Sequence, residues 1–144
     1  MRRLVCGLAV VVASGCGGNS NSSTTAATPA PTATPTAAAS TESFSGTVNV
    51  AGNDFHPFTV ATTGATLSVT LTAAGPPSTI FMGLGVGAYN APTCTLLNNA
   101  FLTTQAGAVA QLSGTAGAGS YCVAVYDVGN QTGPITYAVT VTHY

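Results

Sequence analysis

The sequence predicts an all-β fold, an antiparallel β-sandwich of jelly-roll type with seven or eight strands. Three observations predict it. Apolar residues alternate with Thr, Ser and Asn at a period of two in several short segments, the pattern of half-buried strands. Glycine-containing turn signals separate these segments at near-regular spacing, which is typical of sandwiches. No helical period follows the apolar segment near the N-terminus.

The first residues have the layout of a secretory signal. Arg2 and Arg3 form a positive start, and residues 4–13 are an apolar segment too short to span a bilayer permanently. Ala13, Ser14 and Gly15 then precede Cys16. Small residues directly before a cysteine resemble the bacterial lipoprotein signal, the lipobox, although Ala13 stands where that family most often has leucine.

The lipobox resemblance implies that residues 1–15 are a signal peptide and that Cys16 is acylated and becomes the first mature residue. Attached acyl chains would anchor the protein to a membrane. Gly17 after the cysteine resembles lipoproteins sorted to the outer membrane, at its periplasmic face or the cell surface; a cell without one would carry the protein on the outer face of its plasma membrane. The alternative is an ordinary cleaved signal with an incidental cysteine.

Residues 16–43 form a predicted tether. After Cys16 this segment consists of Gly, Asn, Ser, Thr, Ala and Pro with one charge, Glu42, and it has no large apolar residue before Phe44. Such a composition cannot bury enough apolar surface to offset the entropy cost of ordering, so the segment is expected to be disordered.

The sandwich itself is predicted to span residues 44–144. Alternation or β-branched runs predict strands at 44–50, 58–60, 67–71, 80–86, 109–112, 119–127 and 137–141. Pro57 restricts its strand to a sheet edge or to a start near Phe58. Residues 88–104 are the least regular and predict a long connection with a short strand near Phe101. The segment 119–127 is apolar on both faces and predicts the central strand.

Two cysteines of the predicted domain are expected to pair. Cys94 and Cys122 are the only cysteines after Cys16, and exported proteins mature in oxidising compartments. A disulfide would tie the irregular segment to the central strand. The alternatives are a catalytic thiol, which needs a nearby histidine or cation, and a blue-copper ligand, which needs a histidine shortly after the cysteine. Residues 123–130 contain neither histidine nor methionine.

The scarcity of charged residues excludes nucleic-acid binding. Only 3% of the residues are charged, against about a quarter in typical soluble domains. No Lys or Arg follows Arg3, so the chain lacks the cations that nucleic-acid binding requires. Such low charge favours weak self-association.

A metal site has four weak candidate ligands, which are Asp54, His56, Asp127 and His143. They could coordinate a metal only if two turns met the C-terminal strand. Asx residues belong in turns for backbone reasons, so the prediction is no metal and no cofactor. No serine lies in a nucleophile-elbow pattern and no carboxylate pair is spaced for glycosidase chemistry, so no catalytic residue is predicted.

The predicted domain resembles the bacterial pre-peptidase C-terminal-like domain, a small β-sandwich. The resemblance lies in Asp54 ahead of 58–60, and in the segments 64–71, 118–126 and 137–141. That family is non-catalytic and associated with secretion, substrate binding or protein interaction. Ser78 and Thr79 stand where the family often has an acidic residue, which weakens any calcium- or polymer-binding role known from relatives.

The sequence thus predicts a lipid-anchored, non-catalytic cell-envelope protein whose sandwich binds a protein or a surface polymer such as a polysaccharide. One alternative is a structural or self-associating surface component. A second is a metal-dependent enzyme that uses the four candidate ligands.

Overall fold

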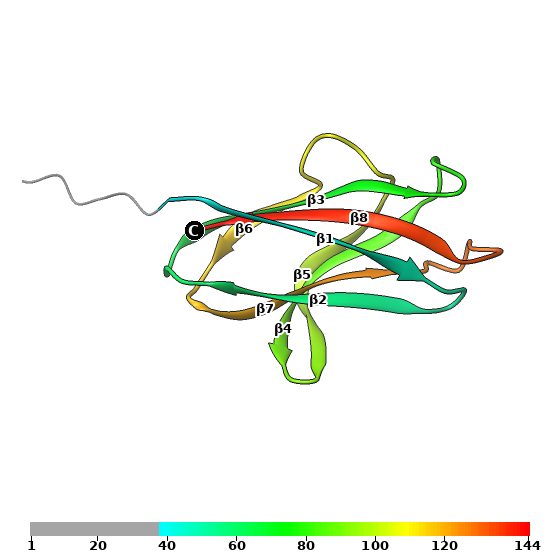
Figure 1. Cartoon of the computed structure of the whole chain (residues 1–144). Coiled ribbons are helices and arrows are strands. Elements are labelled where there is room, and N and C mark those ends of the chain that lie inside the picture. Colours follow the sequence, from blue (N-terminus) through cyan, green and yellow to red (C-terminus); the bar gives the residue numbers. More distant parts are fainter. Residues whose placement is uncertain (1–37) are drawn as a thin grey trace, which may run out of the picture. The chain divides into compact units, whose positions relative to one another are not determined.

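A computed structural model describes residues 38–144 of the chain as two stacked antiparallel sheets (Figure 1). The eight strands are β1 (Ser40–Val48), β2 (Asn53–Val60), β3 (Ala65–Gly75), β4 (Met82–Asn90), β5 (Thr93–Thr104), β6 (Leu112–Ala116), β7 (Gly119–Tyr126) and β8 (Ile135–His143). The first sheet has the order β1-β8-β3-β6 and the second β2-β7-β4-β5. Eight strands in this order make a jelly roll, so the predicted fold class is confirmed.

The core lies between the inner faces of the two sheets. In the first sheet the predicted alternation is confirmed, because every second residue is buried along β8 and along β3 up to Leu71. Facing them are inward side chains of β4 and β7. The largest buried side chains are Leu71, Met82, Leu84, Val48, Val60, Val69, Val123, Val125, Val139 and Val141. Burial of this apolar surface, at about 25 cal/mol per Å², is the main force that holds the sheets together.

Two predictions about where a strand lies within its sheet are confirmed. The apolar strand β7 lies inside its sheet, between β2 and β4. This explains why it is apolar on both faces. Strand β2, which contains Pro57, lies at the edge of the same sheet, where a residue without an N–H costs no ladder hydrogen bond on its free side.

The sandwich begins earlier than predicted. Strand β1 starts at Ser40, so residues 40–43 are paired backbone and not part of the tether. Ser40 pairs with His143, and the hydroxyls of Thr41 and Thr142 lie 3.1 Å apart across the two strands. The strand ends at Val48, and Val50 is half exposed beyond it. Pairing with β8 orders a segment whose own composition is too polar to signal a strand.

The predicted irregular connection at 88–104 is wrong. Strand β4 continues to Asn90, and after a tight turn at 91–92 the chain returns as the twelve-residue strand β5. This hairpin extends beyond the body of the sandwich at the bottom of Figure 1. Most β5 residues are exposed or half-buried, so no apolar alternation marks it in the sequence.

The predicted strand at 109–112 is also displaced. Val109 is 79% exposed in a loop, and strand β6 begins at Leu112. Gln111 holds the loop to β3 through two hydrogen bonds. Its side-chain Oε1 accepts from the Leu71 N–H at 2.8 Å, and its backbone N–H donates to the Val69 carbonyl at 3.0 Å. A side-chain amide thus takes the place of a continued strand pairing.

The predicted signal peptide, the lipidated Cys16 and the tether up to residue 37 lie outside the described residues. Within residues 38–144, no helix long and apolar enough to cross a membrane occurs.

Candidate functional site

Asp54 and His56 form a hydrogen-bonded cluster with Tyr137 at the side of the sandwich where β1 and β2 join the sheets. The Tyr137 hydroxyl donates to Asp54 Oδ2 at 2.7 Å. Because its single proton is used there, His56 Nε2, at 2.9 Å, must carry a hydrogen and donate to the tyrosine oxygen. The His56 ring stacks on Phe44 with centroids 4.9 Å apart. Burial, with the Asp54 hydrogen bond and charge, raises the pKa of Tyr137 far above its usual range.

This cluster fills the space in front of Gly46, between β1, β2 and β8. A Cβ at Gly46 would lie closer to Asp54 Oδ2 and the Tyr137 ring than a real Cβ can approach. Glycine at position 46 is therefore needed to seat the cluster. The three polar side chains act as a structural clamp between β1, β2 and β8.

Asp127 has a backbone role in the turn after β7. Its Oδ2 accepts from the Ala51 N–H at 2.7 Å, and its Oδ1 accepts from Gly129 at 2.8 Å, from Asn130 and from Gln131. The Ala51 hydrogen bond, helped by the other three, lowers the pKa of the Asp127 carboxyl. This aspartate therefore organises the turn after β7.

His143 lies at the far end of β8 from Tyr137. Six residues separate them along the strand, about 20 Å at the usual rise. His143 is 5% exposed, its Nε2 bonds Glu42 Oε1 at 2.9 Å, and its ring packs on Phe58. Its Nδ1 is buried without a hydrogen-bond partner among residues 38–144.

The four candidate metal ligands are thus not brought together. Asp54 and His56 belong to the clamp, Asp127 to a turn and His143 to a pair with Glu42. Across the described range 38–144, no group of three or more His, Cys, Asp or Glu side chains is arranged to hold a metal ion. The convergence on which the metal-enzyme alternative depended does not occur.

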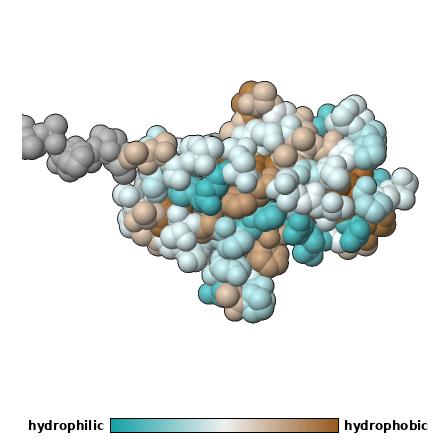
Figure 2. Space-filling view, viewed as in Figure 1, coloured by the Kyte–Doolittle hydropathy of each residue, from teal (hydrophilic) through white to brown (hydrophobic). Residues whose placement is uncertain are grey.

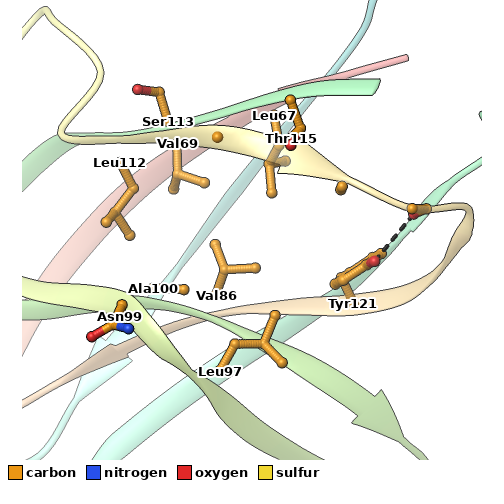
Figure 3. A pocket seen from close by; sticks show the side chains of 13 residues that line it. Leu67, Val69, Val86, Leu97, Asn99, Ala100, Leu112, Ser113, Thr115 and Tyr121 are labelled. Carbon is orange, nitrogen blue, oxygen red and sulfur yellow. Dashed lines mark hydrogen bonds between the residues drawn. The ribbon is translucent and has the colours of Figure 1, made fainter. Parts of the chain in front are cut away.

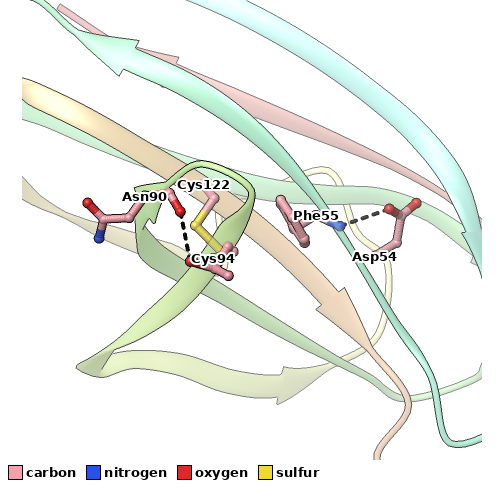
Figure 4. The surroundings of a disulfide bond; sticks show 6 residues. Asp54, Phe55, Asn90, Cys94 and Cys122 are labelled. Atoms are coloured by element: carbon pink, nitrogen blue, oxygen red, sulfur yellow. Dashed lines mark hydrogen bonds between the residues drawn. A yellow bond between two sulfur atoms is a disulfide. The ribbon is translucent and has the colours of Figure 1, made fainter.

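The Cys94–Cys122 disulfide is present and links β5 to β7. These strands are separated by β4, so in a flat sheet they would lie about 9.6 Å apart. Their Cα atoms are only 5.9 Å apart, because the β4–β5 hairpin curls over the outer face of the sheet. Gly87 allows the close approach: a Cβ there would meet the Thr95 carbonyl at 2.6 Å. Figure 4 shows the bridge with Phe55 beside it.

The outer face next to this disulfide has a shallow hollow of about 330 Å³. Its apolar lining includes Phe55, Leu96, Ala124 and Tyr126, and its rim includes Asp127. The Tyr126 ring lies over Gly83. The Asp127 carboxylate is already saturated by backbone N–H groups, so this hollow offers a ligand little beyond side-chain contact.

The opposite side of the sandwich from the clamp is open. There a groove of about 260 Å³ lies between the edge strands β5 and β6, and we call it the β5–β6 groove (Figure 3). Its apolar walls include Leu67, Val69, Val86, Leu97, Leu112 and Tyr121. Three of these, Leu67, Val69 and Val86, are core residues, so the groove reaches the interior of the sandwich.

Two local features of β5 and β7 shape the groove. The pairing of β5 with β4 shifts register, so that Phe101 pairs with Gly85 but Leu96 with Gly87, and residues 97–100 bulge out of the ladder. Asn99 in this bulge has a positive φ of 63°. At the other end, the Tyr121 hydroxyl donates to the Gly117 carbonyl at 3.1 Å and fixes the ring as an end wall.

Gly114 is the central feature of the groove. It pairs with Leu67 in β3, and its neighbours on the same face, Leu112 and Ala116, pack against the core. By strand alternation a side chain at 114 would point between the sheets. A Cβ there meets nothing within 4 Å, although the φ of Gly114 is not in the left-handed region. A core-facing position thus has empty space before it.

Sequence reasoning did not find this site. The glycine at 114 follows the predicted strand 109–112 and reads as part of a turn. No local signal shows that a glycine faces an unfilled space between two sheets, because that depends on the pairing of β6 with β3.

Comparisons with known proteins add a distant structural similarity. No protein-family model matches this chain, and none of the curated proteins matches it. Among solved structures it is similar to the crystal structure of Aeromonas hydrophila PliG, a periplasmic lysozyme inhibitor of g-type lysozyme, with a TM-score of 0.43 and 15% identity over 72% of this chain and 86% of that chain. A similarity of this degree carries no function from that protein to this one. The resemblances to the lipobox and to the pre-peptidase C-terminal-like domain stay predictions.

Proposed function

We propose that this chain is a lipid-anchored, non-catalytic protein of the bacterial cell envelope whose β-sandwich binds another protein. The β5–β6 groove is the observation that carries the binding role. It is an apolar, solvent-accessible space that reaches the core, on the side of the sandwich opposite the clamp.

A non-catalytic role is supported by the state of the titratable side chains. Each described acidic and histidine side chain is engaged within the fold: Glu42 with His143, Asp54 and His56 with Tyr137, and Asp127 with four backbone N–H groups. These contacts give each of these side chains a structural role within the fold.

A protein partner is favoured over a polysaccharide by the groove lining. Sugars are bound through many polar side chains and exposed aromatic faces. The groove walls are mainly aliphatic, and Tyr121, their aromatic member, is tied to Gly117. Apolar side chains of a protein suit these walls better.

The binding proposal is tested by affinity capture with the full-length chain and two matched variants. Gly114→Leu fills the groove, whereas Gly133→Leu adds the same side chain in a loop, also into open space. The bait is exposed separately to detergent-solubilised envelope proteins and to insoluble envelope polysaccharides. A captured protein is identified by mass spectrometry, purified and bound again.

We expect the purified partner to bind the wild type and Gly133→Leu equally and to bind Gly114→Leu at least tenfold more weakly. Capture of polysaccharide alone, or equal binding by all three baits, would contradict the proposal.

The anchor is tested independently through Cys16. Expression of the chain in bacteria fed labelled palmitate should give a labelled protein in the membrane fraction. Cys16→Ser should carry no label and leave the membrane fraction, since stable anchoring depends on the acyl chains. A labelled Cys16→Ser variant, or an unlabelled wild type, would exclude lipidation at this position.

A self-associating surface component remains the second candidate, and strand β5 favours it. This edge strand has twelve residues without a charge or a proline, the devices that usually prevent edge pairing. Sedimentation velocity over a hundredfold concentration range distinguishes a self-associating chain from a monomer. A dimer that Phe101→Lys abolishes, at an exposed β5 position, would support self-association over partner binding.

A further inference from the structure

We infer that the β5–β6 groove takes an extended peptide segment of the partner, which adds to β6 as a new edge strand and inserts an apolar side chain into the space before Gly114. This inference rests on the binding function proposed above and specifies how the partner is recognised. It combines four observations on the groove.

The first observation is the missing side chain. At Gly114 the inner face of β6 lacks the side chain that Leu112 and Ala116 supply on either side, and a Cβ would find nothing within 4 Å. Apolar walls from both sheets surround this space. A side chain from a second polypeptide would gain the contacts that a core residue normally makes.

The second observation is size. At about 260 Å³ the groove lies just below the range of roughly 300–1,000 Å³ in which compact small molecules bind. Its walls come from both sheets, and Tyr121 forms one end. A space of this size and shape suits one or two amino-acid side chains carried on a backbone that remains outside.

The third observation is the free edge. Strand β6 pairs only with β3, so its other side presents unpaired N–H and C=O groups along the groove. The edges on the clamped side are less suited to accept a strand. There β1 carries Glu42, and β2 carries Pro57 and Asp54. An added strand gains affinity from main-chain hydrogen bonds and specificity from alternate side chains.

The fourth observation is charge. No acidic or basic residue lines the groove, and the polar groups on its rim, Asn99, Ser113 and Thr115, are uncharged. A charged side chain placed there would lose hydration without gaining a counter-charge. The recognised segment is therefore uncharged at its inward positions and apolar at every second residue, the pattern that β6 shows at Leu112, Gly114 and Ala116.

The test uses random decapeptides displayed on phage, selected on the immobilised full-length chain with its disulfide intact. Enriched peptides are synthesised and their affinities measured for the wild type, Gly114→Leu and Gly133→Leu. We expect apolar residues at alternate positions, at least tenfold weaker binding to Gly114→Leu, and unchanged binding to Gly133→Leu. Affinity should change less than twofold between 50 and 500 mM salt, because no charge pair contributes.

Backbone N-methylation then distinguishes strand addition from side-chain insertion alone. Methyl groups on alternate peptide nitrogens that face β6 should reduce affinity at least tenfold, and those on the intervening nitrogens should have little effect. Leu97→Glu, at a partly exposed position in the β5 wall of the groove, serves as a second groove variant should Gly114→Leu fail to fold, and it should also weaken binding.

Three results would overturn the inference: no enriched peptide, equal binding to the wild type and to both groove variants, or equal effects of all N-methyl positions. Groove-dependent capture of a folded protein without any peptide binding would keep the proposed function and reject strand addition. Failure of both experiments would reject the binding function itself. A dimer of this chain that Gly114→Leu abolishes would replace the partner with a second copy.

Discussion

At the residue scale, burial of Tyr137 in the core creates a need for hydrogen-bond partners around its hydroxyl. Tyr137 is only 3% exposed, yet its hydroxyl bridges Asp54 and His56 at the closed side of the sandwich. The partners come from strands more than 80 residues apart in the chain. A buried hydroxyl without them would cost about 1–3 kcal/mol of stability, so the clamp satisfies a group that the core has desolvated.

The raised pKa of Tyr137 predicts a loss of stability in alkali. A folded-state pKa above the unfolded value of 10.0 favours the protonated form, so this contribution is complete below pH 10 and is lost as the pH rises further. The free energy of unfolding should therefore fall as the pH rises above 10. Urea titrations at each pH should show a shallower fall for Tyr137→Phe. An equally steep fall would mean that another group causes it.

At the element scale, the β4–β5 hairpin shows how a disulfide and small residues define a surface. Glycines 83, 85 and 87 face outward on β4 and leave space for Tyr126, Leu96 and Cys122 respectively. The hairpin can therefore curl toward β7 and place Cys94 over Cys122. The bulge at 97–100 that accompanies this curl forms one wall of the β5–β6 groove.

Removal of the disulfide should lower stability and weaken partner binding. The two cysteines are 28 residues apart in the sequence. For this separation the chain-entropy model predicts that the double variant Cys94→Ser, Cys122→Ser loses roughly 3–4 kcal/mol of unfolding free energy. Unfolding by urea, with the m-value fitted separately for each protein, measures the loss of stability. Because Leu97 and Ala100 lie in the same strand as Cys94, we also expect weaker capture of the partner by the folded variant. Unchanged stability would show that the hairpin is held by its ladder alone.

At the scale of the whole molecule, the described domain is almost without charge. Between residues 38 and 144 the charged and histidine side chains number five, namely Glu42, Asp54, His56, Asp127 and His143. Figure 2 shows a surface of mostly pale residues, with strongly hydrophilic ones in separate small groups. Hydroxyl and amide side chains must therefore supply most of the solvation, and long-range repulsion is small at neutral and acidic pH.

This charge pattern predicts unusual resistance to acid. Without Lys or Arg in the domain, protonation of three carboxylates leaves only two positive histidines, too few to unfold it by repulsion. The hydrogen bonds of Asp127 lower its pKa, so its contribution is present above pH 3.8 and is lost as the pH falls below that value. Circular dichroism should show a native domain at pH 2 with a reduced Tm. In Asp127→Asn the Tm should fall less between pH 5 and 2. Unfolding above pH 3 would contradict this account.

Much of the fold could be predicted from the sequence because its signal is local. In β3 and β8, apolar and polar residues alternate at the period of a strand, and the buried residues follow that alternation. Pro57 identified an edge, Asp127 a turn, and the pairing of Cys94 with Cys122 followed from their number and compartment. Strand β5 gave no such signal, because a hairpin that is exposed along most of its length needs no apolar face.

What the sequence alone determined, then, was the class of fold, the disulfide and the absence of Lys and Arg after residue 3. Only the tertiary structure decided which edges stay unpaired, that Tyr137 joins Asp54 and His56, and that Gly114 faces an empty space. The physical reason is range. Strand alternation and turns depend on neighbouring residues, whereas a groove between two sheets depends on the register of strands that meet only after the chain has folded.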